Sequence, residues 1–349
     1  MATRRRIVVA GASLAAGRAL GVAASEWDSG DAENQGLRAG AVADTLRAGE
    51  TLPGLRALLV ARRGVLVAER YYAGGAAEKL QPINSATKSV CSLLVGLALR
   101  DGRLKSLDDT VAALIPDAVA EVPDSPAARI SLRQILTGRT GLAFDLMLGR
   151  ELAESKPLVQ YVLRRPAVPV GPPGWSYNDA MVSLLAPILQ RAQGADLSVL
   201  AAQQLFAPMR IERHEWRRDG DGNPIAFGGL ALRTRDLLKF AALMADGGRW
   251  RGTQVLPEAW VTESLTPHGA ATWRPEAVSD IGYGLLWFTG RLHGQRVAWA
   301  WGYGGQFSLL APELGLAVAT AATSPPASAV REQTNAVMTL VGSMIEAAG

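Results

Sequence analysis

The sequence predicts a mixed α/β fold of the α+β type, in which one antiparallel sheet forms from both chain ends, is flanked by helices and carries an inserted, mostly helical subdomain. Three observations support this: short apolar runs with turn signals near the start, helical apolar spacing in the middle, and short strands before a closing helix near the end. The 349 residues are 48% hydrophobic, enough to bury a large core. We expect about 50–80 and 225–349 to form the sheet part, and about 81–224 to form the helical part.

The first 24 residues have the features of an export signal. An arginine triplet at positions 4–6 precedes a mostly apolar stretch, and small residues stand before Ser25. The run 3–8 is also similar to a twin-arginine signal. An arginine inside the apolar stretch keeps an uncleaved anchor or an ordinary N-terminus open as alternatives. We expect export to the periplasm or the medium, and a single domain over 25–349.

Residues 25–53 are polar, and we expect a surface lead-in with one short helix. Two apolar runs around Arg63-Gly64, within residues 56–72, then predict a β-hairpin.

Ser85 stands three residues before Lys88, ahead of an apolar run with helical spacing that ends at Asp101-Gly102. With 19 serines and 5 lysines in 349 residues, chance supplies about a quarter of one such pair. Unpaired backbone N–H groups and the positive end of the helix dipole favour an oxyanion at Ser85, and the spacing lets Lys88 reach its hydroxyl. The pair is either a nucleophile with its base or a capping serine followed by a solvated lysine.

Helix-patterned pieces separated by Pro and Gly continue to residue 205, and Ser131 is placed to cap one of them. Between them, residues 172–174 force a loop before Tyr177, and a helix is expected to start near Asp179. A phenol on a rigid loop can relay a proton if neighbouring positive charge lowers its pKa. A tyrosine that only packs on the loop is the alternative.

In the last third, Thr234 is expected to cap a helix, short strands begin with residues 283–288, and a closing helix covers roughly 328–347. One turn between strands holds Tyr303, Gly304, Gly305 and Gln306. Glycines there let a substrate approach the backbone and leave the Gln306 N–H to stabilise an oxyanion. A strand edge with a bulge is the alternative.

Composition excludes several function classes. The first 24 residues contain four arginines and no acid, so the net charge of +4 falls to about zero without them, and nucleic-acid binding is not expected. The single cysteine, Cys91, excludes an internal disulfide, and the three histidines are too far apart in sequence for a zinc motif. Neither a metal nor a cofactor is expected. No segment after the first 24 residues approaches 18 uncharged apolar residues, so membrane insertion of the exported chain is not expected either.

Taken in order, the motifs Ser-x-x-Lys, Tyr-x-Asp and Tyr-Gly-Gly resemble those of the serine β-lactamase and penicillin-binding-protein superfamily. The resemblance covers roughly 55–345 and is to the β-lactamase-related branch of class C-like esterases and 6-aminohexanoate-dimer hydrolases. It implies a β-lactamase/transpeptidase-like fold and a serine hydrolase that forms a covalent acyl-enzyme on small-molecule esters or short amides. It also implies site residues: Ser85 as nucleophile, Lys88 as base, Tyr177 as proton relay, the Ser85 and Gln306 amides as oxyanion donors, and Asp179, Tyr303, Gly304 and Gly305 against the substrate.

Two positions depart from the family pattern. Asp179 stands where relatives carry an Asn amide, and Tyr303 stands where relatives carry a cation that pairs with a β-lactam or peptide carboxylate. These departures favour neutral esters or short amides. A β-lactamase or DD-peptidase acting on cell-wall-like substrates, and a non-turnover binding protein on the same fold, are the alternatives.

Overall fold

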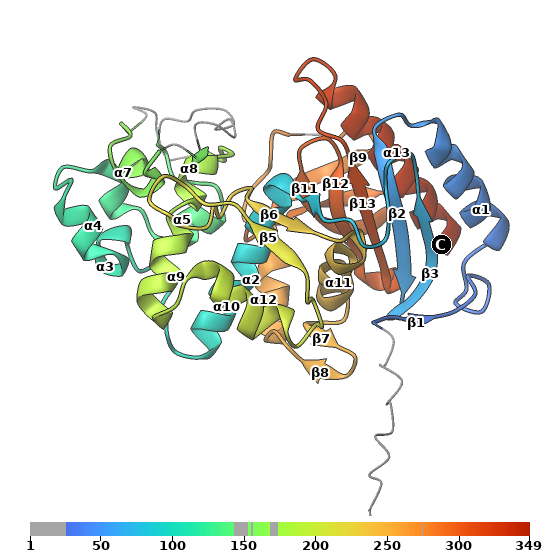
Figure 1. Cartoon of the computed structure of the whole chain (residues 1–349), viewed down its shortest axis with the longest axis horizontal. Coiled ribbons are helices and arrows are strands. Elements are labelled where there is room, and N and C mark those ends of the chain that lie inside the picture. The colour runs from blue at the N-terminus through green and yellow to red at the C-terminus, as the bar shows by residue number, and fades with distance from the viewer. Residues whose placement is uncertain (1–25, 143–152, 155, 168–173, 274) are drawn as a thin grey trace, which may run out of the picture.

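The computed structural model describes residues 26–142, 153–154, 156–167, 174–273 and 275–349, so the expected export signal lies outside the described residues. The central sheet has eight strands in the order β1-β3-β2-β13-β12-β11-β10-β9 (Figure 1). Its strands are β1 (Asp28–Ser29), β2 (Leu55–Arg62), β3 (Val65–Tyr71), β9 (Val278–Tyr283), β10 (Phe288–Leu292), β11 (Gln295–Gly302), β12 (Gln306–Ala311) and β13 (Leu316–Ala322).

Strands from the two chain ends lie side by side in this sheet, which confirms the predicted fold class. The hairpin strands β2 and β3 pair through a turn at Arg63 and Gly64, both at positive φ, and β2 then pairs antiparallel with β13, with Val60 opposite Val318. All strands of the sheet are antiparallel to their neighbours except β1, which runs parallel to β3. The short strand β1 in the polar lead-in was not predicted.

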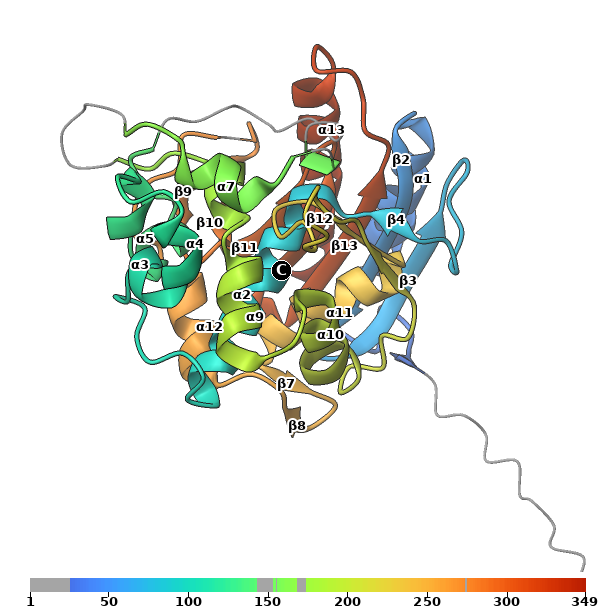
Figure 2. The same ribbon diagram turned by 60° about the vertical axis from the view of Figure 1, so that its left-hand side comes forward.

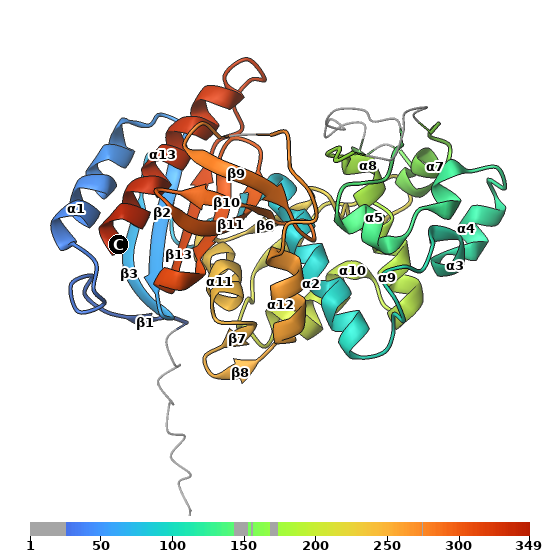
Figure 3. The same ribbon diagram turned by 180° about the vertical axis from the view of Figure 1, so that it is seen from behind.

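Helices cover both faces of the sheet (Figures 1 and 3). On the outer face, α1 (Ala39–Ala48) packs against the closing helix α13 (Val330–Ala348), and α11 (Thr234–Ala245) covers the other face with α12 (Glu258–Leu265) beside it. Thr234 is the first residue of α11, and Arg233 occupies the cap position, so the predicted cap was one residue late. A two-stranded ribbon of β7 (Arg249–Trp250) and β8 (Thr253–Gln254) follows α11.

The strand predicted over residues 283–288 is wrong in its position. The strand β9 ends at Tyr283, and residues 284–287 form the connection to β10. In this connection Leu286 has a φ of 62°, and a Cβ added to Gly284 would lie 2.0 Å from the Ser264 carbonyl oxygen. A side chain has no room at Gly284, so the apolar residues of this segment pack as a turn against α12 rather than extend as a strand.

The helical part lies beside the sheet, and α2 (Thr87–Arg100) runs between the two (Figures 1 and 2). Every residue of α2 from Thr87 to Ala98 is buried, because this helix packs on all sides. The helical part also includes the following elements: η2 (Asn84–Ala86), α3 (Val111–Leu114), α4 (Pro116–Ala120), η3 (Pro126–Arg129), α5 (Leu132–Leu136), α7 (Leu158–Leu163), α8 (Asp179–Val182), α9 (Leu185–Gln193), α10 (Leu197–Ala201) and η4 (Ala202–Phe206).

Local signals account for several of these boundaries. Ser131 caps α5 in a reciprocal capping box with Gln134, as predicted. A small sheet of β4 (Gln81–Pro82), β6 (Leu230–Leu232) and β5 (His214–Trp216) borders the start of α2. Within the described residues, no helix has both the length and the apolar character needed to cross a membrane.

Candidate active site

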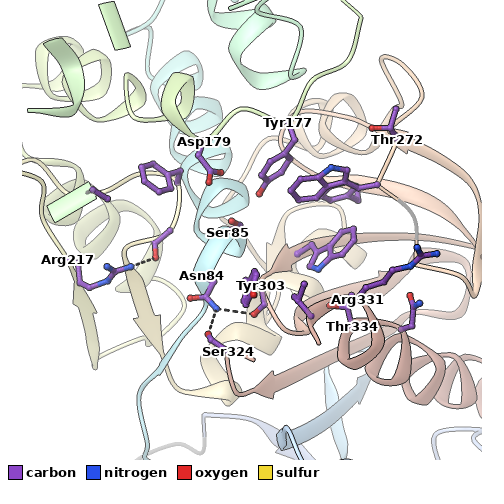
Figure 4. A pocket seen from close by; sticks show the side chains of 18 residues that line it. Asn84, Ser85, Tyr177, Asp179, Arg217, Thr272, Tyr303, Ser324, Arg331 and Thr334 are labelled. Carbon is purple, nitrogen blue, oxygen red and sulfur yellow. Dashed lines mark hydrogen bonds between the residues drawn. The ribbon is translucent and has the colours of Figure 1, made fainter. Parts of the chain in front are cut away.

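A cavity of about 670 Å³ takes its wall residues from both the sheet part and the helical part (Figure 4). Four of the predicted site residues line it: Ser85, Tyr177, Asp179 and Tyr303. They come from segments far apart in the sequence, so the cavity exists only in the folded chain. A cavity with a few convergent polar groups is the usual form of a small-molecule site.

Ser85 lies in the short turn η2 directly before α2 and is half-buried. Its neighbour Asn84 has a φ of 49°, a left-handed conformation that asparagine tolerates better than most residues. The Asn84 side-chain amide donates to the Tyr303 carbonyl oxygen at 3.0 Å and to the Ser324 hydroxyl at 3.2 Å. Asn84 therefore ties the turn that carries Ser85 to the turn that carries Tyr303, a contact that the sequence analysis missed.

Lys88 lies one helical turn after Ser85 and is 2% exposed. Its Nζ is 2.6 Å from Asp179 Oδ1, donates to the Phe227 carbonyl oxygen at 2.9 Å, and lies 4.6 Å from the centre of the Tyr177 ring. Burial lowers the pKa of Lys88 below its usual value, and the Asp179 carboxylate opposes part of that effect. Lys88 therefore loses its proton more readily than an exposed lysine, while the carboxylate holds it in place.

Asp179 is the first residue of α8, and the preceding Asn178 caps this helix by accepting from the Met181 N–H at 3.1 Å. This cap fixes the direction of the chain at Tyr177 and Asp179. Asp179 is itself buried, so its contact with Lys88 is an ion pair shielded from water. The position that departs from the family pattern thus keeps contact with the lysine, as a charge instead of an amide.

The Tyr177 phenol is buried, and its hydroxyl faces Ser85 in the cavity wall (Figure 4). Its pKa lies well above the usual value, first because of burial and then because of the Asp179 charge, although the nearby Ser85 side chain works in the other direction. The sequence analysis made a proton relay conditional on a pKa lowered by positive charge, and positive charge does not lower this pKa. Tyr177 is a neutral phenol at physiological pH, able to pass on a proton but not to act as a resident phenolate.

The turn between β11 and β12 brings only one of its predicted residues to the cavity. Tyr303 lines it and donates its hydroxyl to the Pro325 carbonyl oxygen at 3.0 Å. Gly304 and Gly305 have φ values of 84° and 97°, and a Cβ on either would run into Thr323 and Pro325 or into Val337.

Gln306, the residue after these two glycines, is also not among the residues of the described cavity wall. Gln306 is 1% exposed, lies opposite Gly302 in the hairpin, and uses its side-chain amide to bridge the Ala322 main chain. Gly304, Gly305 and Gln306 are not among the residues that line the described cavity, and their placement against the substrate stays a prediction. The glycines are needed for the turn itself, since their φ values are unfavourable for other residues.

Sequence reasoning also missed most of the cavity wall. Arg217 lines one side, where it pairs with Glu154 at 3.0 Å, and Arg331 lines another, where it pairs with Glu276 at 3.2 Å. Since two cations are present, the absence of a cation at Tyr303 does not by itself exclude an anionic substrate. Besides Tyr177 and Tyr303, the aromatic residues of the wall are Phe227, Trp273, Phe288 and Trp301. No motif marks them, because they come from separate loops and strands.

Other chemistries find no matching arrangement in the described part of the chain. No group of three or more His, Cys, Asp or Glu side chains there is placed to hold a metal ion. Cys91 is buried next to Lys88, donates to the Ala226 carbonyl oxygen at 3.3 Å, and has its pKa raised by burial. It therefore remains a thiol, as expected of a buried structural cysteine.

Comparison with known proteins agrees with this geometry. A sequence model of the Beta-lactamase family matches residues 41–343. The chain is 26% identical over 244 residues to the 6-aminohexanoate-dimer hydrolase of Paenarthrobacter ureafaciens, a match that covers 65% of this chain and spans 60% of the length of that relative.

Two solved structures share the fold. A protein from Bacillus anthracis, proposed to be a 6-aminohexanoate-dimer hydrolase, superimposes with a TM-score of 0.70 at 16% identity, covering 87% of this chain and 82% of its own. EstCE1, described as a hydrolase with promiscuous acyltransferase activity, gives a TM-score of 0.66 at 15% identity, covering 87% and 99%. Because the family match extends over most of the chain, this protein belongs to the β-lactamase family.

Proposed function

We propose that this protein is a serine hydrolase that forms a covalent acyl-enzyme on Ser85 with small esters or short amides. One observation supports this most directly: the half-buried Ser85 lies on the cavity wall, faces the Tyr177 hydroxyl and is one helical turn from a buried lysine whose pKa is lowered. A nucleophilic hydroxyl needs a base that is neutral near the working pH, and a buried lysine can supply it. The hydrolase names of the relatives support the same class.

In the proposed acylation, the Ser85 proton passes to neutral Lys88, directly or through the Tyr177 hydroxyl, as Ser85 Oγ bonds to the substrate carbonyl carbon. The tetrahedral intermediate then expels the alcohol or amine, which takes its proton from Tyr177, and Lys88 restores that proton to the phenol. A water molecule then attacks the acyl-enzyme with the same proton transfers, which releases the acid and restores the Ser85 hydroxyl. Tyr177 suits this relay because it is neutral and its hydroxyl faces Ser85.

We propose that the oxyanion is held by the backbone N–H groups of Ser85 and Gln306. Ser85 precedes the N-terminus of a 14-residue helix, whose dipole favours negative charge. Gln306 is the first residue of β12, directly after the turn that holds Tyr303, and Asn84 ties this turn to the one that carries Ser85. A Cβ on Gly302 would lie 2.1 Å from the Ile83 carbonyl oxygen, so these two backbones pack closely.

A serine-directed fluorophosphonate is expected to modify Ser85, and tandem mass spectrometry of the peptide should locate the adduct there. Ser89, on the same helix as Lys88, is an internal control because it is buried and donates to the Leu286 carbonyl oxygen at 2.7 Å. With p-nitrophenyl acetate, repeated turnover distinguishes an enzyme from a binding protein, which would keep the acetyl group without further product release. An adduct on any residue other than Ser85 would refute the assignment.

The pH profile of kcat/KM for a neutral ester is expected to have an acid limb set by Lys88, since only its neutral form accepts the Ser85 proton. The groups that face its Nζ are the Asp179 carboxylate, the Tyr177 ring, the Cys91 thiol and the Phe227 carbonyl. The Asp179 charge stabilises the ammonium form, so Asp179→Asn should lower the Lys88 pKa further. The acid limb should then move to lower pH by about one unit or more.

A suitable control for this shift is Asp101→Asn, which removes an exposed carboxylate at the other end of the same helix. Its acid limb should stay where the wild-type limb lies, because solvent screens that charge from the site. If Asp179→Asn leaves the acid limb unmoved, Lys88 is not the group that limits the rate at low pH.

A further inference from the structure

An aromatic wall extends from Tyr177 along one side of the cavity. The Trp273 ring stacks on Tyr177 with centroids 4.2 Å apart at 27°, and Trp301 meets Trp273 edge-on at 6.0 Å. Phe288 contacts Trp301 edge-on at 5.1 Å, and all three of these rings line the cavity. We call Trp273, Phe288 and Trp301 the aromatic arm. Such contacts hold large rings in defined positions, so the arm is a preformed apolar surface.

The aromatic arm lies on a definite side of Ser85. In Figure 4, Tyr177, Arg331 and Thr334 lie on one side of Ser85, while Asp179 and Arg217 lie on the other. The arm shares the Tyr177 side, because Trp273 stacks directly on that ring. The far end of the same side is polar, formed by residues at the start of α13.

The chemistry of the reaction connects this side with one part of the substrate. The departing oxygen or nitrogen must reach a proton donor, and Tyr177 is the neutral acid that faces Ser85 in the cavity wall. The departing group therefore lies beside Tyr177, along the aromatic arm, and the acyl group points to the opposite side. From this geometry we infer that the enzyme prefers esters and amides whose departing alcohol or amine carries an apolar or aromatic group. This inference rests on the proposed function.

The test compares two ester series that separate the departing group from the acyl group. In acetates of methanol, propanol, butanol and hexanol, only the alcohol lengthens, and the intrinsic reactivity changes little along the series. In methyl esters of acetic, butyric and hexanoic acid, only the acyl group lengthens. We expect kcat/KM to rise about two- to fourfold per methylene in the alcohol series, as for burial of a methylene, and by less per methylene in the acyl series.

The ratio kcat/KM is the correct measure, because it reports steps up to release of the alcohol even if deacylation limits kcat. Trp273→Ala should at least halve the slope of the alcohol series on a logarithmic scale, whereas Trp273→Phe should retain most of it. Trp250→Ala removes an equally large side chain from the wall of a separate cavity and should leave the slope unchanged. Equal slopes for both series in the wild-type enzyme would overturn the inference, as would a steeper acyl series.

Failure of the proposed function gives a different result from failure of this inference. If no ester is turned over, the proposed function is refuted. The aromatic arm is then tested by the binding of benzyl alcohol, measured through tryptophan fluorescence. Binding to the wild-type protein that weakens at least tenfold in Trp273→Ala supports the arm as an apolar site. Absence of binding, or equal binding by both proteins, refutes it.

Discussion

Ser85→Ala is expected to lower kcat/KM for p-nitrophenyl acetate by about three to six orders of magnitude. The alanine removes the only oxygen at this position that can bond to the carbonyl carbon. The oxyanion donors and the cavity would remain, so any residual rate above that of water measures their contribution alone. Initial rates over a range of ester concentrations provide the comparison, and the absence of a fluorophosphonate adduct in the variant provides an independent readout.

The matched control for this change is Ser89→Ala on the same helix. Ser89 is as small and more deeply buried, but its hydroxyl donates to the Leu286 carbonyl oxygen and it is not part of the described cavity wall. Its loss should cost about 1 kcal/mol of stability and little activity. Wild-type activity in Ser85→Ala would remove the acyl-enzyme proposal altogether.

Lys88→Met is expected to lower kcat/KM by about three orders of magnitude or more and to destabilise the fold as well. The two effects have different causes. Activity falls because the base is lost, whereas stability falls because Asp179 is left as a buried, unpaired carboxylate. Removing one partner of a buried ion pair typically costs about 3–5 kcal/mol. Urea denaturation measures the second effect and ester hydrolysis the first.

The double variant Lys88→Met with Asp179→Asn separates these causes. Without the carboxylate, no charge is left unpaired, so the free energy of unfolding should recover most of the loss. Activity should not recover, because the base is still missing. A double variant that regains activity together with stability would show that Lys88 acts only through the fold, and its role as base would have to be abandoned.

The parts of the site that the sequence predicted correctly depend on local signals. Apolar spacing after Ser85 predicts α2, and the helix then places Lys88 one turn from Ser85 whatever surrounds it. The hairpin around Arg63-Gly64 and the Ser131 cap are likewise determined within a few residues. Where the local signal was weaker, the prediction was wrong. The apolar residues before β10 were predicted to form a strand, although Gly284 has no room for a side chain and the segment turns there.

The sequence by itself therefore determined α2 and the spacing of Ser85 and Lys88, because these follow from short-range patterns. The order of strand and helix patterns along the whole chain indicated the fold class and the shared sheet of the two chain ends. Only the tertiary structure decided that Asp179 pairs with Lys88, that Tyr177 has a raised pKa, and that the Gln306 side chain is bonded to the Ala322 main chain. A pKa depends on burial and on charges that distant segments bring together. The position of the Gln306 side chain depends on how β11 pairs with β12. The aromatic arm depends on loops and strands that meet only after folding.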